Sequence, residues 1–343
     1  MKKDILGTTV FLIMTCVLFL AVQNVFGVSN KFSEHAEMMF EGYYDEPKDT
    51  VDAVIIGNSH IYRYWQSAFG WKEYGLSTLA LSTSDMPGSV MKNMAIEAGK
   101  TQSPKLFVFD ATAFAGKDDV KNNKIYMMLN NMRLSKNYID TVDSFCDYAD
   151  VEGMDRFQFY LPIIQFHSRW KEINQSDFEQ TYPSYLNSCY MEEFLTSTIE
   201  DRAHNATDER VKIGKKNERV LRELLEWCKG QEAEVQFLAV PMLRGQKKLG
   251  MINYVGDIVE EYGFDFLNYN DADLYESFDF NVPVDFQDRN HTNVNGSYKF
   301  SKVYGKYLVD KYSLKDHRGE SAYASWDERA DAYMKQIEKY FIY

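Results

Sequence analysis

Val51-Asp52-Ala53-Val54-Ile55-Ile56 is a short apolar run that ends in the turn Gly57-Asn58-Ser59-His60. Such a run, bounded by a turn, is typical of a strand buried on both faces of a sheet. Helical stretches at residues 90–98 and 209–229 lie between further runs of this kind. The alternation predicts an α/β fold with a parallel sheet and right-handed crossovers. The further apolar runs, of which the last is the weakest, are residues 76–81, 106–109, 235–240 and 264–267.

The N-terminus has a different character from the rest of the chain. Lys2 and Lys3 precede an uncharged, mostly apolar run over residues 5–30, and acidic residues follow it. A helix needs about 20 apolar residues to cross a bilayer, and basic residues favour the cytoplasmic side. We expect a single-pass anchor in the cell membrane, with everything downstream extracytoplasmic. A cleaved signal peptide is the alternative, but its apolar region is normally shorter and Val22-Gln23-Asn24 is a poor cleavage site.

The remaining chain is predicted to form one domain. After an anchor at residues 1–30, residues 31–50 have the polar, aromatic-containing composition of a stalk. Residues 51–313 are expected to form one folded domain, because no Pro/Gly/Ser-rich linker interrupts them. Residues 115–205 are rich in aromatics, Asn and Asp and hold no strong strand, which indicates a largely helical insertion, a cap or lid above the sheet edge. Residues 314–343 are expected to be a C-terminal helical tail.

Charge and cysteine content exclude some classes of partner and site. The formal net charge of −13 argues against nucleic acid, although a local basic groove could still bind an anionic wall polymer. Cys16 lies within the apolar run, which leaves Cys146, Cys189 and Cys228, an odd number with no close-spaced pair. This pattern indicates neither a metal site nor a disulfide framework, although one bridge would be possible.

Ser59 is the first candidate for chemistry. It follows the end of the first predicted strand, at the sheet edge where open α/β sheets bind ligands. Gly57 permits the tight turn, and residues 61–69 can form a helix whose N-terminus favours developing negative charge. A serine becomes nucleophilic only beside a base that takes its proton. Alone, a Gly-Asn-Ser sequence is more often an ordinary turn.

Asp288 and His291 are the second candidate element. They lie in a loop over residues 285–293 that leads into a predicted helix over residues 298–312. An aspartate three residues before a histidine can accept a hydrogen bond from its imidazole, which fixes the tautomer and stabilises the imidazolium. An isolated pair of this kind is more often a surface pair with no shared role.

Together the two elements resemble the SGNH (GDSL-like) superfamily, in particular its membrane-anchored branch that modifies surface polysaccharides and teichoic acids. The quartet 57–60 occupies the place of the family's G-D-S motif, and Asp288 to Gly296 resembles its D-x-x-H-x-N-x-x-G block. The likeness extends over residues 50–312, but only these two blocks are specific. It implies a three-layer, flavodoxin-like parallel sheet. Ser59 would then be the nucleophile, His291 the general base and later acid, and Asp288 the orienting carboxylate, with no metal or organic cofactor.

The two middle blocks of the family depart from its pattern. The oxyanion-hole glycine after the second strand is missing, and a main-chain N–H of Thr83 or Ser84 is the expected substitute. The asparagine after the third strand is replaced by Asp110, followed by Ala111 and Thr112. Because a carboxylate would repel an oxyanion, either Thr112 helps or the site is built differently.

Two further features concern the ligand and the source. His167 and Arg169, next to Trp170, resemble a His-x-Arg-Trp segment of related anchored members and would suit a polar or sugar ligand, with plain packing as the alternative. A glycan on Asn290 would bury His291, so this glycosylation triplet favours a bacterial origin. The N-x-S/T triplets begin at Asn174, Asn205, Asn290 and Asn295.

The resemblance implies an extracytoplasmic serine esterase or O-acyltransferase. Its substrates would be acetyl or D-alanyl groups on a cell-surface polysaccharide or teichoic acid, handled through an acyl-serine intermediate. A membrane-bound acyl-transfer protein is the expected partner. The irregular middle blocks leave a second hypothesis, a catalytically weak or inactive binding or scaffold protein of a cell-envelope assembly machinery. A lipase-like hydrolase that prefers long acyl chains is a third. Hydrolysis and transfer share the acyl-enzyme, so the choice between them stays open.

Overall fold

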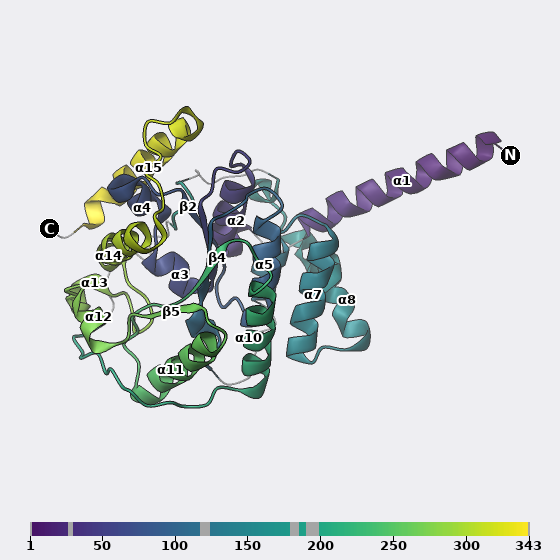
Figure 1. Cartoon of the computed structure of the whole chain (residues 1–343). Helices are drawn as coiled ribbons and strands as arrows, with labels where there is room; N and C mark the ends of the chain where they lie inside the picture. Colours follow the sequence, from purple (N-terminus) through teal and green to yellow (C-terminus); the bar gives the residue numbers. More distant parts are fainter. Residues whose placement is uncertain (1, 27–29, 117–123, 179–184, 190–198, 342–343) are drawn as a thin grey trace.

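The computed structural model describes residues 2–26, 30–116, 124–178, 185–189 and 199–341. A five-stranded sheet in the order β2-β1-β3-β4-β5 forms its centre, and every neighbouring pair is parallel (Figure 1). All five strands fall on the apolar runs of the sequence, which confirms the predicted α/β fold. They are β1 (Ala53–Gly57), β2 (Thr78–Ser82), β3 (Leu106–Asp110), β4 (Glu234–Ala239) and β5 (Asp265–Asn268).

The strand order determines where a ligand site can form. An order of 2-1-3-4-5 is one of the common doubly wound arrangements, in which ligands bind beyond the carboxyl ends of the strands. Gly57 at the end of β1 lies opposite Ser82 at the end of β2, and Ile56 lies opposite Phe109 on β3. The loops after these three strands therefore emerge side by side at one edge.

Helices cover both faces of the sheet, because side chains alternate along each strand. Val54 and Ile56 on β1 belong to one buried cluster, and Ala53 and Ile55 belong to the other. The first cluster is covered by α5 (Met91–Ala98), α10 (Lys215–Cys228) and α11 (Gln246–Glu261), and the second by α3 (Ser59–Tyr64) and α14 (Val294–Tyr312). The sheet domain also holds α4 (Ser67–Tyr74), α12 (Ala272–Glu276) and α13 (Val282–Asp285).

The helix predicted over residues 61–69 is split in two. It begins earlier, at Ser59, and α3 ends at Tyr64, after which Trp65 and Gln66 adopt extended backbone before α4. Gln66 accounts for the break: its side-chain nitrogen donates to the Tyr62 carbonyl, and its side-chain oxygen accepts from the Cys189 N–H. The amide thereby satisfies a backbone group that a continuing helix would have bonded.

The first helix, α1 (Lys2–Val25), projects away from the rest of the molecule (Figure 1). Residues 5–22 have a mean hydropathy of 2.6 and none of this stretch is buried. By length and composition, this helix is able to cross a membrane.

The stretch predicted as a stalk is a packed helix, which corrects that expectation. Residues 30–44 form α2 (Asn30–Tyr44), which packs against β2 and α6 (Ile125–Leu129). Met39, Phe40 and Tyr43 are buried, with at most 1% of each exposed. With Ala36 they are spaced three and four residues apart, so they form one apolar face of a helix. This amphipathic pattern outweighs the polar overall composition.

Residues 124–178 of the stretch 115–205 are mostly helical, whereas residues 185–189 and 199–205 hold neither helix nor strand. Residues 117–123, 179–184 and 190–198 lie outside the described residues. α7 packs against α5, α6 against α2, and α9 against α1. The insertion therefore flanks the sheet on the side of α2 and α5. The sequence instead predicts a cap above the carboxyl edge of the sheet. Besides α6, its described α-helices are α7 (Lys136–Ala149), α8 (Phe157–Tyr160) and α9 (Pro162–Phe166).

The C-terminal tail ends in a helix packed on the domain surface. α15 (Ala324–Ile337) lies against α4, with Trp326 and Tyr333 almost fully buried. The last two residues of the tail's aromatic run, 342–343, lie outside the described residues.

Candidate active site

The turn after β1 presents Ser59 at the carboxyl edge of the sheet. Asn58 caps α3, because its side-chain oxygen accepts a hydrogen bond from the His60 N–H at 2.9 Å. Gly57 is required by close approach: a Cβ there would lie 2.4 Å from the Asp110 Cβ and 2.6 Å from Ile61 Cγ1. Glycine, cap and helix start together fix the backbone that carries the Ser59 hydroxyl.

The loop before α14 presents Asp288 and His291. It is closed by a bridge between Phe286 and Thr292, and the Gln287 N–H donates to the His291 carbonyl at 2.9 Å. The loop's D-x-x-H-x-N-x-x-G pattern therefore has a structural basis as well as a chemical one.

Its asparagine and glycine both support the loop. Asn293 caps α14 by accepting from the N–H groups of Asn295 and Gly296, at 2.9 and 3.3 Å. Gly296 packs so tightly that a Cβ would lie 2.2 Å from the Asp285 carbonyl oxygen. These contacts fix how α14 leaves the loop.

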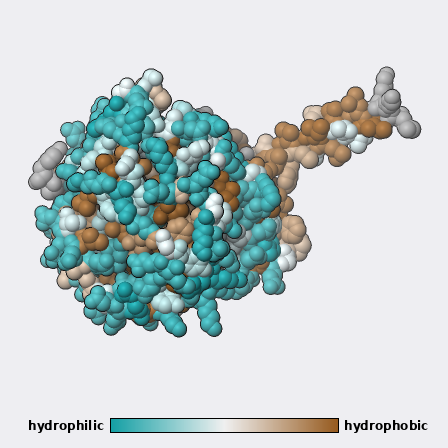
Figure 2. Space-filling view, in the orientation of Figure 1, coloured by the Kyte–Doolittle hydropathy of each residue, from teal (hydrophilic) through white to brown (hydrophobic). Residues whose placement is uncertain are grey.

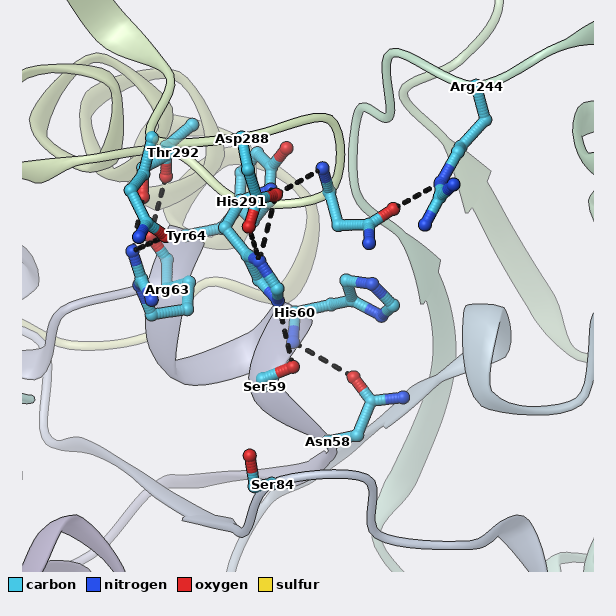
Figure 3. A network of polar contacts seen from close by, with 12 residues as sticks. Asn58, Ser59, His60, Arg63, Tyr64, Ser84, Arg244, Asp288, His291 and Thr292 are labelled. Carbon is cyan, nitrogen blue, oxygen red and sulfur yellow. Dashed lines mark hydrogen bonds and ion pairs between the residues drawn. The ribbon is translucent and has the colours of Figure 1, made fainter. Parts of the chain in front are cut away.

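The two loops meet, and the three residues that the sequence singles out form one chain of hydrogen bonds (Figure 3). Ser59 Oγ lies 2.9 Å from His291 Nε2, although the two residues are 232 positions apart. His291 Nδ1 lies 3.0 and 2.9 Å from the two carboxylate oxygens of Asp288. Asp288 Oδ1 also accepts from the N–H groups of Asn290 at 2.7 Å and His291 at 3.1 Å. This is the geometry expected of a nucleophile, its base and an orienting acid.

The electrostatics of the pair suit a neutral imidazole. Burial alone would raise the pKa of Asp288, but hydrogen bonds from the His291 ring and the Asn290 N–H outweigh it and lower this pKa to about 2. Burial lowers the pKa of His291, and its hydrogen bond to Asp288 opposes that shift only in part. An ionised Asp288 accepts the Nδ1 proton, which leaves the Nε2 lone pair facing Ser59.

Arg63 joins the two loops and was missed in the sequence analysis. Its guanidinium donates to Gln287 Oε1 at 2.9 Å and to the Thr292 carbonyl at 3.3 Å, and the Thr292 hydroxyl donates to the Arg63 carbonyl at 2.5 Å. Burial lowers the pKa of Arg63 to about 10, so it stays a cation at neutral pH. The available signal was spacing: Arg63 follows Ser59 by four residues, which places both on one face of a helix.

Asp110 and Thr112 lie beneath the Ser59 turn and do not face a ligand, which corrects their expected role at an oxyanion or substrate site. Asp110 is fully buried, and its carboxylate accepts from the Thr112 N–H at 2.8 Å and hydroxyl at 2.6 Å. The Asn58 N–H is 3.4 Å from the other carboxylate oxygen. Asp110 therefore supports the turn, because both of its carboxylate oxygens accept hydrogen bonds from groups of the protein itself.

His60 lies against the His291 imidazole. The rings of His60 and His291 stack with centroids 5.5 Å apart (Figure 3). His60 Nδ1 is 2.7 Å from the Thr112 hydroxyl, which itself donates to Asp110. Nδ1 must then carry the proton in this contact, because the hydroxyl has only one hydrogen to donate.

Ser84 and Thr83 follow β2 and lie beside the Ser59 turn, as the strand register requires. Thr83 is buried, whereas Ser84 is partly exposed and its hydroxyl accepts from the Tyr62 hydroxyl at 3.4 Å. Their main-chain groups remain the candidates for oxyanion contact.

Two cations near the site come from the loop and helix that follow β4. Arg244 donates to the Asn290 side-chain oxygen at 2.5 Å. Lys248 donates to the carbonyl oxygens of Ala115 and Thr112, and burial lowers its pKa to about 8. Neither residue stands in a motif, so only the topology brings them to this edge.

His167 and Arg169 lie with the insertion at the base of α1, an arrangement that favours plain packing over contact with a ligand. Arg169 forms an ion pair of 2.5 Å with Asp177 and donates to the Val25 carbonyl at 3.4 Å, at the end of α1. His167 is exposed, and its Nδ1 lies 3.0 Å from the Ile164 carbonyl oxygen. The insertion carries this stretch to the base of α1 because α9 packs there.

No family model matches the chain, and no curated protein is significantly similar to it. The arguments for a function therefore come from the site geometry and from the two sequence blocks that form it.

Proposed function

We propose that the chain is a membrane-anchored serine esterase or O-acyltransferase of the SGNH kind, with Ser59 as its nucleophile. One observation carries the proposal: the Ser59 hydroxyl is 2.9 Å from His291 Nε2, and Nδ1 of the same ring is 2.9 Å from an Asp288 oxygen. If Asp288 and His291 were only a surface pair, nothing would place the Ser59 hydroxyl, 232 positions away in sequence, at hydrogen-bond distance from the ring.

The chemistry is acyl transfer in two steps. Ser59 Oγ attacks an ester carbonyl while its proton moves to His291 Nε2, and the imidazolium then gives that proton to the departing alcohol. This leaves an acyl-serine. Water or an acceptor hydroxyl next attacks the acyl group, His291 takes the proton of that attacker, and the proton finally returns to Ser59 Oγ. Hydrolysis and transfer differ only in this second attacker.

Oxyanion stabilisation would come from the main chain. Ser59 is the first residue of α3, and N–H groups in a helix's first turn have no acceptor within the helix. The Ser84 N–H, on the neighbouring loop, is the second candidate donor. Side-chain help from Asp110 or Thr112 is unsupported, because their polar atoms bond within the protein. Loss of one such donor typically costs about a hundred- to a thousand-fold in rate, which keeps a weakly active scaffold as the rival hypothesis.

The substrate class rests on the resemblance of the two blocks to the anchored SGNH branch. It points to acetyl or D-alanyl groups on a surface polysaccharide or teichoic acid. The apolar α1 suits this role, because it would hold the domain outside the membrane, beside the polymer and beside a membrane-bound acyl-transfer protein.

Labelling with a fluorophosphonate tests the nucleophile in the full chain held in detergent micelles. We expect the native protein to be labelled and to release acetate from acetyl esters, and Ser59→Ala to lose both properties. Ser103→Ala is the matched control, because Ser103 is exposed just before β3, at the opposite edge of the sheet.

Equal labelling and turnover in native protein and Ser59→Ala would rule out the serine-enzyme hypothesis and favour the scaffold. A marked preference for long acyl chains would instead favour a lipase-like hydrolase.

A further inference from the structure

Exposed apolar side chains are confined to one part of the domain. Among the described residues after α1, every exposed large hydrophobic lies between Ile96 and Phe178. Five of them form what we call the apolar patch: Met154, Phe157, Ile164, Trp170 and Phe178, which are exposed by 79, 46, 49, 63 and 66%. Large apolar side chains gathered on a surface usually mark a contact with a partner or a membrane.

The elements that carry the patch are continuous with one another. Met154 lies in the 3₁₀ turn Gly153–Arg156, which packs against α8, and α8 carries Phe157. α8 packs in turn against α9, which carries Ile164. The turn His167–Lys171, which carries Trp170, packs against α9 as well.

This surface meets α1 at its base. α9 packs directly against α1, and Arg169 donates to the Val25 carbonyl at the end of that helix. Arg169 is itself fixed by Asp177, next to Phe178. In Figure 2 the brown of α1 continues into brown and tan atoms at the edge of the body where the helix joins it.

From this continuity we infer that the apolar patch rests in the interfacial layer of the bilayer that α1 spans. The insertion is then a second membrane contact, which fixes the orientation of the domain. The inference rests on the proposed membrane anchorage and adds a site to it. The occupant is lipid: the end of a spanning helix lies at the level of the head groups, so side chains packed around it lie at that level too.

The composition of the patch fits that layer. Trp170 is the kind of residue enriched at membrane interfaces, and the Lys171 ammonium lies 5.4 Å from the centre of its ring. Such a pair can place its aromatic ring at the boundary between head groups and acyl chains, and its cation among the head groups. Two other cations of this surface pair with carboxylates, Arg169 with Asp177 and Arg156 with Asp143.

The test uses the full chain in vesicles of phosphatidylcholine and phosphatidylglycerol, with no other protein present. Cys146, Cys189 and Cys228 are buried, so an environment-sensitive NBD label on native protein reports Cys16 within α1. In a Cys16→Ser background, labels are placed at Met154→Cys and Trp170→Cys. The matched control is Glu276→Cys, an exposed position on α12, which Figure 1 shows on the other side of the body from α1.

We expect lipid-borne quenchers to quench the labels at 16, 154 and 170, with a blue-shifted emission, and to leave the label at 276 unaffected. A quenched label at 16 with aqueous labels at 154 and 170 would overturn the inference while leaving the anchor intact. An aqueous label at 16 would overturn the anchor and the inference together. A protein partner as the true occupant would give the aqueous result at 154 and 170, because none is present.

A second variant separates docking from mere tethering. Phe157→Ser, Ile164→Ser, Trp170→Ser and Phe178→Ser together remove exposed apolar side chains, so the core is untouched. We expect the label at 154 to lose its lipid quenching in this variant, down to the level of the label at 276, with the α1 signal unchanged. Persistent quenching at 154 would show that α1 alone holds the surface near the lipid, which contradicts the inference.

Discussion

The Asp288–His291 hydrogen bond decides which proton the imidazole carries. Asp288 holds the proton on Nδ1, and its hydrogen bond and charge raise the pKa of His291 against the lowering effect of burial. Removal of the carboxylate charge has two separate effects. The ring can take the wrong tautomer, and its pKa falls further.

Asp288→Asn should therefore reduce kcat for acetyl-ester turnover by a factor on the order of 10⁴, by analogy with the loss of the acid in serine-protease triads. Activity requires neutral His291, so the rate rises with pH through the pKa of that ring and levels off above it. Because burial lowers this pKa, the native rise should lie below the ordinary value of 6.5, and the residual rise in Asp288→Asn should lie lower still. A pH–rate profile of both proteins checks this, and an unchanged rise with an unchanged kcat would contradict the assigned role.

Single residues also show what local sequence encodes about the candidate site and what it does not. The triad residues stand in short motifs whose spacing is set by local backbone, such as the cap at Asn293 and the crowding at Gly296, so the sequence could place them. Asp110 stands where a ligand contact was expected, yet it is buried under the turn. Side-chain direction at the end of a strand depends on packing from other elements, and local sequence does not encode it.

At the scale of elements, the strands were predictable because buried parallel strands have continuous apolar sequences. The helix α2 was not predicted. Its solvent-facing side carries charged residues, so the average composition of the segment is polar although one face of the helix is apolar. The same element holds an unusual group. His35 is 4% exposed, and its ring lies against the Tyr62 ring, tilted by 40° with centroids 4.8 Å apart. Neither of its ring nitrogens has a hydrogen-bond partner among the described residues.

His35 should make the fold sensitive to acid. Burial lowers its pKa from 6.5 to about 4, so the unfolded chain binds this proton at a higher pH than the folded one. The neutral ring costs the fold nothing above pH 6.5, but the free energy of unfolding decreases as pH falls from 6.5 toward 4. The total decrease by pH 4 is about 3 kcal/mol. We expect His35→Phe, which keeps a ring of similar size, to lose less stability than the native protein between pH 7 and pH 4.

Urea unfolding of the full chain in micelles at several pH values measures this difference. His167→Gln is the matched control, because it removes a histidine from an exposed position outside the core. A His35→Phe curve parallel to the native curve across this range would show that the ring does not titrate in the folded core.

At the scale of the whole molecule, segments far apart in sequence close around one sheet. α4, early in the domain, packs against α14 and α15 from its end, and α2 packs against β2. The folded unit therefore begins at α2, where the sequence predicted a stalk, and α1 is the one element of the described chain that projects without burying its middle.

This architecture predicts where the chain can be shortened. A chain without residues 1–26 should still unfold cooperatively, since none of residues 5–22 is buried. A chain without residues 1–50 should fail to fold, because it loses Met39, Phe40 and Tyr43 from the core. Each large buried side chain is worth about 2–5 kcal/mol, and domains of this kind are stable by only about 5–15 kcal/mol in all.

Phe40→Ala in the chain without residues 1–26 tests whether the buried face of α2 is the cause. Near-UV circular dichroism on heating should show a lower unfolding temperature, although α2 itself is still present. If the chain from residue 51 onward melted as sharply and at the same temperature as the chain from residue 27, α2 would be dispensable and the domain would begin at β1.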